Sequence, residues 1–309
     1  MQHTRVTIDA DQRPSVTACY LRIAGEECAF IEAHTVHALP RLLSALEENG
    51  RRVEDVRYVI VTHAHLDHAA GAGALLAACP NATFVSNART VKHLAAPRKL
   101  VLGARVVYGD AFDALYGEIL PVPEDRAIAV EDGGRIELGD ARLGFFDTFG
   151  HAFHHSIVDD AALDTVSAGD TVGLVYPALQ GHGRFALPST SPTGFHAAEA
   201  QKSIEKVVSL GRTVVCPTHY DAWTGVAEIG AQVGRFVARA GEWVEAAAKT
   251  DDPMPEIQAR IASEWWKAIA EEAPRFGDDE RRHLEPDVWI NSQGLAYAAD
   301  ALRRERAEA

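Results

Sequence analysis

Hydrophobic and polar positions along this chain follow two different patterns. In the earlier part, short apolar or β-branched runs are separated by Gly, Pro, Asn and Asp, which is typical of strands joined by turns. The run VRYVIV at 56–61 is nearly continuously hydrophobic, as expected of a buried strand. Up to residue 86 the pattern predicts strands within 4–31, a helix over 37–49, the strand 56–61, a helix over 69–79 and a strand over 83–86.

The later part of the chain changes from strands to helices. Residues 88–125 are mostly helical or irregular, strands return within 127–168, and a Gly-, Pro- and Ser-rich loop occupies 171–194. The elements expected after this loop are a helix over 197–210, a strand over 213–216, and helices over 226–248, 254–273 and 286–307. We therefore expect a mixed α/β domain over residues 1–222 and a C-terminal helical extension over 223–309.

Composition narrows the class of protein. With 309 residues, 47% of them hydrophobic, the chain can bury one large core. Its beginning, MQHTRVTIDADQRPSV, lacks the regions of a signal peptide, and no run approaches the ~18 apolar residues of a membrane span. A formal charge of −14 disfavours nucleic acids and anionic membranes as partners, although not an anionic substrate at a metal site. We expect a cytoplasmic protein, forming a homodimer, that acts on a small molecule.

The cysteines carry no recognisable chemistry. They are scattered among expected strands and helices and form no CxxC pair. Buried, reduced thiols are the favoured interpretation, and a hairpin pairing of Cys19 with Cys28 is the alternative. The tryptophans of the helical extension are interpreted either as ordinary core residues or as part of a lid or a dimer interface.

The densest chemical signal is the segment THAHLDH at 62–68, directly after VRYVIV. His63, His65, Asp67 and His68 place four potential ligands within six residues. Imidazole and carboxylate are the ligands that zinc, iron and manganese accept in open catalytic sites. In an extended segment His63 and His65 share one side, while Asp67 and His68 turn into the next helix. One segment can thus serve two neighbouring metals, an interpretation we favour over a solvated polar turn.

Three further positions repeat the design of a β-rich run that ends in a ligand-type residue. ARLGFFDTFG ends in His151, DTVSAG ends in Asp170, and TVVCPT ends in His219. A sheet can fix such residues rigidly while the loops around them vary. Each position alone is a weak signal, because a single His or Asp at a strand end is usually a capping or solvated residue. The series of four is a strong one.

The combined pattern resembles the metallo-β-lactamase superfamily. Its HxHxDH, GH and GD motifs and a late His match 63–68, Gly150-His151, Gly169-Asp170 and Thr218-His219. The resemblance covers residues 4 to about 222 and implies a four-layer α/β/β/α sandwich with metals at one edge. It implies two divalent metal ions, with zinc as the default and iron or manganese as alternatives. The implied first metal has His63, His65 and His151, the second has Asp67, His68 and His219, and Asp170 bridges both.

The ligand set suggests a hydrolase. Two cations lower the pKa of a shared water, and the resulting hydroxide attacks a carbonyl or phosphoryl group. Asp67 could also orient this water or carry its proton. The bridging Asp resembles the glyoxalase II, lactonase and thioesterase side of the superfamily, so we expect a thioester, ester or lactone as substrate. The alternatives are a mononuclear non-haem iron dioxygenase of the persulfide type, which tends not to use the full second-metal set, and a phosphodiesterase, whose nuclease branches usually carry basic surfaces.

Some positions depart from the family pattern. Many relatives have Asp-Thr-Gly after the third strand, where this chain has Ile31-Glu32-Ala33-His34-Thr35, and we expect Glu32 to replace that Asp beside the ligands. His34 lies either near the pocket or at a helix start. His154 and His155 are interpreted as part of a polar loop, with a contact to a ligand as the alternative. The 171–194 loop matches neither the glutathione-binding pattern of glyoxalase II nor the lactonase tyrosine, because Gly173 stands at that tyrosine's position.

Overall fold

The structure is a computed structural model that describes residues 3–11, 13–191 and 194–308. Positions 192 and 193 of the expected 171–194 loop, and positions 1, 2 and 12 of the N-terminal segment, lie outside the described residues, as does 309. Contacts group the chain into two compact units. Unit 1 comprises Met1–Asp147, His154–Gly169 and Arg212–Thr224, and unit 2 comprises Thr148–Phe153, Asp170–Gly211 and Gly225–Ala309. The division into a domain over 1–222 and a helical extension over 223–309 stays a prediction.

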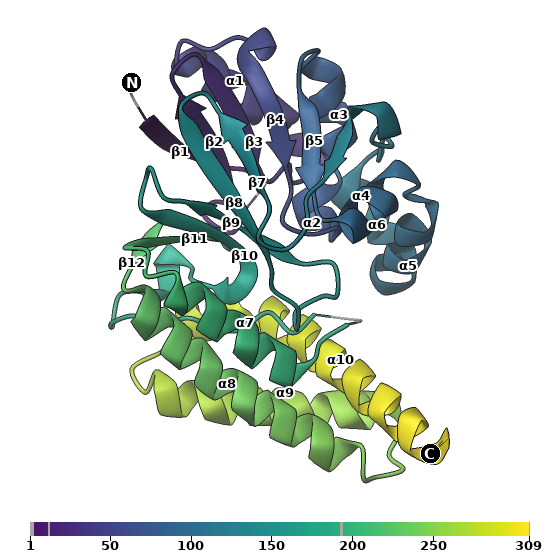
Figure 1. Cartoon of the computed structure of the whole chain (residues 1–309). Coiled ribbons are helices and arrows are strands. Elements are labelled where there is room, and N and C mark those ends of the chain that lie inside the picture. Colours follow the sequence, from purple (N-terminus) through teal and green to yellow (C-terminus); the bar gives the residue numbers. More distant parts are fainter. Residues whose placement is uncertain (1–2, 12, 192–193, 309) are drawn as a thin grey trace. The chain divides into compact units, whose positions relative to one another are not determined.

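The first sheet contains the strands expected from the N-terminal part of the chain (Figure 1). Its order follows the sequence, with β1 to β3 antiparallel and β3 to β6 parallel. The strands are β1 (His3–Asp9), β2 (Ala18–Ala24), β3 (Glu27–Ile31), β4 (Val56–Ile60), β5 (Thr83–Ser86) and β6 (Ala127–Ala129). The run VRYVIV supplies β4, which lies between β3 and β5 and is therefore paired on both edges.

The second sheet has the order β12-β11-β10-β9-β8-β7. Its strands are β7 (Arg135–Leu138), β8 (Ala141–Asp147), β9 (Ser156–Asp160), β10 (Thr165–Leu174), β11 (Val214–His219) and β12 (Trp223–Thr224). Strand β10 continues beyond the expected loop start at 171, and every one of its ten residues is buried. The expected loop is shortened further by a 3-10 turn at Pro177–Leu179. Burial of the whole strand explains why its Gly and Thr residues remain in the sheet.

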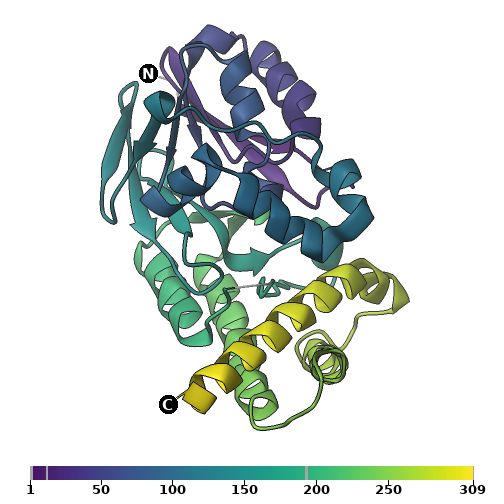
Figure 2. The same cartoon turned by 90° about the vertical axis from the view of Figure 1, so that its right-hand side faces the viewer.

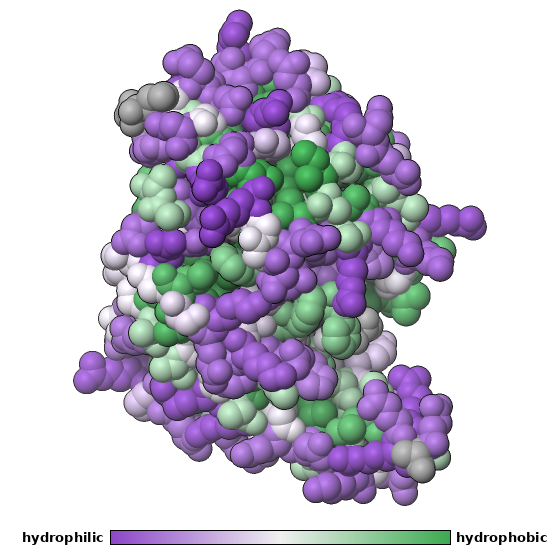
Figure 3. Space-filling view, in the orientation of Figure 1, coloured by the Kyte–Doolittle hydropathy of each residue, from purple (hydrophilic) through white to green (hydrophobic). Residues whose placement is uncertain are grey.

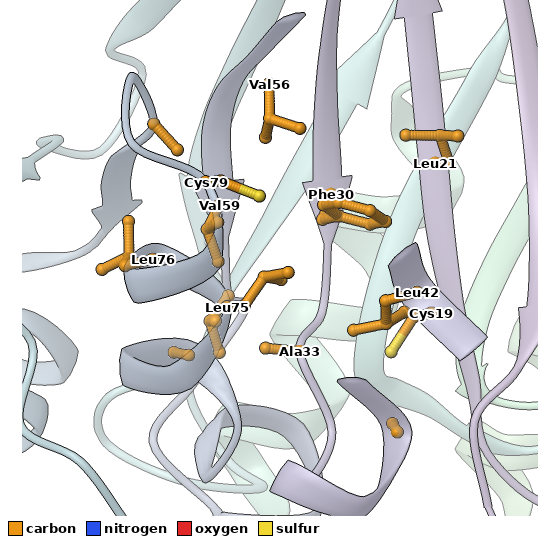
Figure 4. Close-up of a cluster of buried hydrophobic side chains, with 14 of the residues drawn as sticks. Cys19, Leu21, Phe30, Ala33, Leu42, Val56, Val59, Leu75, Leu76 and Cys79 are labelled. Carbon is orange, nitrogen blue, oxygen red and sulfur yellow. The ribbon is translucent and has the colours of Figure 1, made fainter. Parts of the chain in front are cut away.

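The core of unit 1 has two layers of apolar contacts. Between the two sheets, side chains such as Tyr20, Ile60, Leu143 and Val158 pack against one another. On the other face of the first sheet lie helices α1 (Leu39–Glu48) and α3 (Ala72–Ala78). Figure 4 shows this second layer, in which Leu42 and Leu75 face the strand residues Phe30 and Val59. Two facing sheets covered by helices are the arrangement that the sequence predicts.

The remaining helices of unit 1 lie where the sequence predicts helical or irregular structure. Helix α2 (Leu66–Ala69) follows β4 after the connection 61–65, and α4 (Ala88–Ala95), α5 (Arg98–Tyr108) and α6 (Phe112–Tyr116) lie between β5 and β6. Leu66 and Ala70 of α2 pack against Phe112 and Tyr116 of α6. The α5–α6 segment is therefore fixed to the helix that carries Asp67 and His68.

Unit 2 contains the C-terminal helices (Figure 2). They are α7 (Ala197–Ser209), α8 (Val226–Ala247), α9 (Met254–Glu272) and α10 (Asp278–Glu308). The expected start of the last helix, at residue 286, is wrong, because α10 begins eight residues earlier and contains Pro286 in its interior. Proline is common in the first turn of a helix, so the sequence pattern placed a helix start there. Trp265 is fully buried and packs against Phe236 and Trp243, which confirms a core role for this tryptophan.

The surface and the cysteines agree with the composition. The face shown in Figure 3 is mostly hydrophilic. Among the described residues, no helix combines the length and apolar character that crossing a bilayer requires. All four cysteines are buried and free, as expected, and Cys19 and Cys28 form no disulfide.

Candidate metal centre

The HxHxDH segment forms the connection between β4 and α2. His65 is the N-cap residue of α2 with an extended backbone, and Asp67 and His68 lie in its first turn. The side chains of His63 and His68 are fully buried, and the Asp67 carboxylate is 40% exposed. The His63 Nε2 and His65 Nδ1 atoms are 3.0 Å apart. The change from strand to helix within six residues thus brings imidazoles from both conformations together.

Asp67, His68 and His219 form one group of three donors. Strand β11 ends at His219, whose Nε2 is 3.4 Å from Asp67 Oδ2. The Nε2 of His68 is 3.5 Å from the same oxygen. One donor atom from each residue lies within 4.8 Å of the others, a spacing that could hold a metal ion. Residues separated by about 150 positions in the chain therefore meet as expected.

The second ring nitrogen of each of three histidines is already engaged by protein. His68 Nδ1 is 3.3 Å from Glu32 Oε1, His219 Nδ1 is 3.2 Å from the Val16 carbonyl oxygen, and His63 Nδ1 is 3.0 Å from Thr62 Oγ1. Such contacts fix the ring orientation and the tautomer of metal-binding histidines, and leave Nε2 for the metal. The donor set therefore fits a divalent cation by its chemistry as well as by its spacing.

Glu32 organises this arrangement from the end of β3. Its Oε1 accepts hydrogen bonds from the hydroxyls of Thr62 and Thr218, the latter at 3.1 Å, and also contacts His68. Glu32 is 1% exposed and has a left-handed backbone with φ of 68°. A left-handed conformation is uncommon for residues other than glycine and is retained where surrounding contacts impose it. The expected position of Glu32 beside the ligands is confirmed.

His154 and His155 contact the ligand segment. His154 Nδ1 accepts a hydrogen bond of 3.2 Å from the Ala64 backbone N–H, and the ring centroid of His155 is 4.6 Å from that of His63. Both residues lie in the loop between β8 and β9, as the favoured interpretation expects, and both also contact the ligand segment, as the alternative expects. Gly169 has a φ of 51°, and a Cβ there would lie 2.5 Å from His155 Nε2. Only glycine allows this close approach of β10 to the histidines.

His151 and Asp170 are paired within unit 2. His151 Nε2 is 3.4 Å from Asp170 Oδ2, and both residues are 4% exposed. His151 Nδ1 is 3.0 Å from the Ser189 carbonyl oxygen, so this histidine too has its second nitrogen engaged. Gly150 precedes it with a φ of 116°, and a Cβ there would lie 2.1 Å from the Ala200 backbone nitrogen. The histidine of the GH motif and the aspartate of the GD motif therefore lie next to each other, and close packing against Ala200 requires a glycine at position 150.

Two further features of unit 1 lie outside the set of candidate ligands. His34 Nε2 lies 3.7 Å from Asp11 Oδ2. Burial raises the pKa of Asp11, but the contact with His34, the hydrogen bond from the Arg13 backbone N–H and the charges of His34 and Arg13 outweigh it, so the net pKa lies below the usual value. Burial raises the pKa values of Tyr108 and Tyr116 on the α5–α6 segment, and the Asp67 charge raises them further. Sequence reasoning missed both tyrosines, because 88–125 carries no motif.

Comparison with known proteins identifies the fold independently. The sequence model of the metallo-beta-lactamase superfamily matches residues 15–219. A sequence comparison with curated proteins finds no match. Solved structures are similar in fold at low sequence identity, and two of them match nearly the whole chain.

These two are members of the same superfamily. One, from the archaeon Sulfolobus tokodaii, is 20% identical with a TM-score of 0.65, covering 96% of this chain and 99% of its own. The other, from Thermus thermophilus, is 18% identical with a TM-score of 0.67, covering 98% and 94%. A third, described as a peroxy diiron species of the chemotaxis sensor ODP, is 15% identical with a TM-score of 0.54, covering 75% and 90%. The coverage shows that the C-terminal helices have counterparts in the first two folds.

Proposed function

Because this chain belongs to the metallo-beta-lactamase superfamily, whose members are generally metal-dependent hydrolases, we propose that it is a dinuclear metal-dependent hydrolase of a thioester, ester or lactone. The observation that carries the proposal is the group of Asp67, His68 and His219, with the second nitrogens of both histidines held by protein oxygens. A non-catalytic protein of this fold has no need for so complete a second-metal set.

The proposed ligands follow the family motifs. His63, His65 and His151 would hold one metal, Asp67, His68 and His219 the other, and Asp170 both. Zinc is our first choice, since imidazole and carboxylate donors suit it, while iron and manganese accept the same donors. When bound, two such cations lower the pKa of water and polarise the carbonyl under attack.

The protein groups have separable roles in this proposal. The Asp67 side chain is 40% exposed, compared with 11% for His219 and 3% for Asp170, and its carboxylate accepts the proton of the attacking water. Glu32 holds His68 in orientation and, through Thr62 and Thr218, ties the ends of β4 and β11 together. This rigidity keeps Asp67 in place while the substrate carbonyl is converted to a tetrahedral centre.

Two other activities remain as alternatives within the proposal. An iron enzyme draws support from the diiron sensor among the fold relatives. A mononuclear dioxygenase, however, has no use for Asp67, His68 and His219 as a second set. A phosphodiesterase is less favoured because the chain carries a formal charge of −14, which opposes the approach of polyanions away from the metals.

A hydrolysis panel tests the proposed function. Zinc-, iron- and manganese-loaded protein would be assayed with thioesters, lactones, carboxyl esters and bis(p-nitrophenyl) phosphate, before and after chelation. We expect chelator-sensitive hydrolysis of a carbonyl substrate. His68→Ala should abolish it, whereas His37→Ala, an exposed histidine of unit 1, should not. Full activity after metal removal, or oxygen consumption with a persulfide in place of hydrolysis, would reject the proposal.

A further inference from the structure

The HxHxDH segment is held from one side by the loop that precedes β9. The Ser156 N–H donates a 2.9 Å hydrogen bond to the Thr62 carbonyl, and the Ser156 hydroxyl donates to the same oxygen at 3.1 Å. Two residues further along the segment, the Ala64 N–H donates to His154 Nδ1 at 3.2 Å. These contacts fix the backbone on both sides of His63, so the position of this candidate ligand depends on the loop.

The two contacts have the hydrogen-bond pattern of an antiparallel strand pair in which His63 lies opposite His155. Such a pair is flanked on each side by one backbone hydrogen bond, and its two side chains lie close together. The Ser156 N–H makes the first bond, and the ring centroids of His63 and His155 are 4.6 Å apart. The second bond would join the Ala64 N–H to the His154 carbonyl, but His154 Nδ1 takes the place of that carbonyl. Ala64 is fully buried, so its N–H needs this acceptor.

The His154 carbonyl points to helix α4 instead. It accepts hydrogen bonds from Asn87 Nδ2 at 2.8 Å and from Thr90 Oγ1 at 2.9 Å. Asn87 is the N-cap residue of α4, and its Oδ1 accepts from the N–H groups of Arg89 and Thr90. Thr90 is 0% exposed and Asn87 7%. Moving the carbonyl to Ala64 would take an acceptor away from two buried donors, so the imidazole remains the partner of Ala64.

The contact with Ala64 also fixes the state of the imidazole. A backbone N–H only donates, so His154 Nδ1 accepts and carries no proton, and the neutral ring has its proton on Nε2. A histidine binds a metal through an unprotonated nitrogen, and in this ring that nitrogen is committed to Ala64. The ring centroid of His154 is nevertheless 5.3 Å from that of His65 and 6.0 Å from that of His63. His154 is therefore suited to support these two histidines and not to join them as a ligand.

We propose that His154 is a positioning residue that fixes His63 and His65 for the first metal, with its imidazole acting as the acceptor for the backbone between them. The inference rests on the metal pair of the proposed function and adds a support for one half of it. Ala64 lies between the two histidines, and holding its N–H fixes the planar peptide unit that joins it to His63. The ring that holds it lies beside both imidazoles, so backbone and side chains are fixed together.

The candidate ligands of the second metal have other supports. His68 contacts Glu32, and His219 contacts the Val16 carbonyl oxygen. Neither of these contacts involves His154. A positioning role for His154 therefore predicts a loss of affinity mainly in one of two metal-binding steps, whereas a general loss of stability would weaken both.

The test uses full-length protein, with Zn²⁺ as the probe and titration calorimetry to resolve two binding steps. His65→Ala identifies the step that belongs to the first metal. His154→Ala should weaken that step about 10- to 100-fold, the usual effect of losing a supporting contact. Before metal is added, exchange of the Ala64 amide hydrogen, followed by NMR, should become about threefold to tenfold faster in His154→Ala, as expected for one lost hydrogen bond.

Two conservative variants and one control sharpen the test. His154→Asn should keep most of the affinity and of the Ala64 protection, because its Oδ1 is as many bonds from the backbone as Nδ1 and also accepts. His154→Gln carries its acceptor one bond farther out and should behave like His154→Ala. His93→Ala, which removes the exposed imidazole whose ring centroid is 5.3 Å from that of His154, is the matched control and should change neither quantity.

The outcomes separate this inference from the proposed function. Two bound metals without hydrolysis of any substrate would reject the proposed function, and the Kd values of the His154 variants would still decide the inference. Equal Kd values for the first metal in the wild type and His154→Ala would overturn it, as would an equal loss in both steps. If His154→Ala does not fold, His154→Asn should bind the first metal more tightly than His154→Gln, and equal affinities of these two variants would also overturn it.

Discussion

At the scale of single residues, Glu32 is the side chain on which most of the candidate centre depends. It has hydroxyl and imidazole partners from two separate segments, 62–68 and the end of β11, and is almost fully buried. Glu32→Gln keeps the shape but replaces one carboxylate oxygen with an amide that donates. We expect metal affinity to fall about 10- to 100-fold, the usual effect of losing such a supporting contact. Competition with a metal-sensitive dye measures it, and Glu48→Gln on the exposed face of α1 is the control. Unchanged affinity would show that Glu32 does not orient His68.

Asp67 has a different expected signature, because its role includes the proton of the attacking water. Asp67→Asn keeps an oxygen that can contact a metal but removes the negative charge and the basicity. We expect kcat to fall by about 10²- to 10⁴-fold with a much smaller loss of bound metal. Steady-state kinetics combined with metal analysis checks this, with Asp113→Asn on α6 as the matched surface variant. If Asp67→Asn lost all its metal and showed no catalytic effect beyond that loss, the role of Asp67 would be that of a metal ligand alone.

At the scale of elements, α10 holds a loop that supports His151. Asn291 is 1% exposed; its Oδ1 accepts a 2.8 Å hydrogen bond from the Thr190 N–H, and its Nδ2 donates to the Pro188 carbonyl at 2.9 Å. Between these residues lies Ser189, whose carbonyl contacts His151. A Cβ on Gly294, one turn later, would lie 1.7 Å from the Thr190 oxygen, so helix and loop are in close contact.

This contact predicts a local effect of Asn291→Ala. The substitution leaves buried backbone groups of 188–190 without partners, which costs about 1–3 kcal/mol. Hydrogen exchange at Thr190 should accelerate, and hydrolysis should fall because His151 loses its support. Gln258→Ala, which removes an exposed contact with α10, should change neither. Unaltered exchange at Thr190 would contradict this account of α10.

The elements also show what the sequence could and could not predict. Continuous apolar runs such as β4 were predicted closely, because burial on both faces leaves a clear signal. Helix α10 was placed too late, since Pro286 resembles a helix start although packing of Leu284 and Val288 carries the helix through it. The candidate ligand positions are predictable because a β-rich run precedes each of them, although Asp170 lies within β10 and not after it. The packing of α5 and α6 on α2 is not predictable, since it joins residues distant in the chain that carry no motif.

At the scale of the whole molecule, burial makes the four cysteine thiols poorly reactive. Burial raises the pKa of Cys28 to about 12, of Cys79 to about 11 and of Cys216 to about 12, so none is a thiolate at neutral pH. Native protein should therefore react with Ellman's reagent at pH 8 only as fast as it opens, whereas guanidinium should expose all four thiols at once. A rapid reaction of any thiol in the native protein would show that the packing in Figure 4 opens readily.

The central claim is the proposal that His63, His65, Asp67, His68, His151, Asp170 and His219 serve a pair of metals. Elemental analysis of the purified, zinc-loaded protein, compared with its His68→Ala variant, tests it most directly. The account predicts about two metals per chain in the wild type and about one in the variant, as expected when one of two adjacent sites is lost. A wild type that binds less than one metal under every loading condition, or a variant with the same content as the wild type, would contradict it.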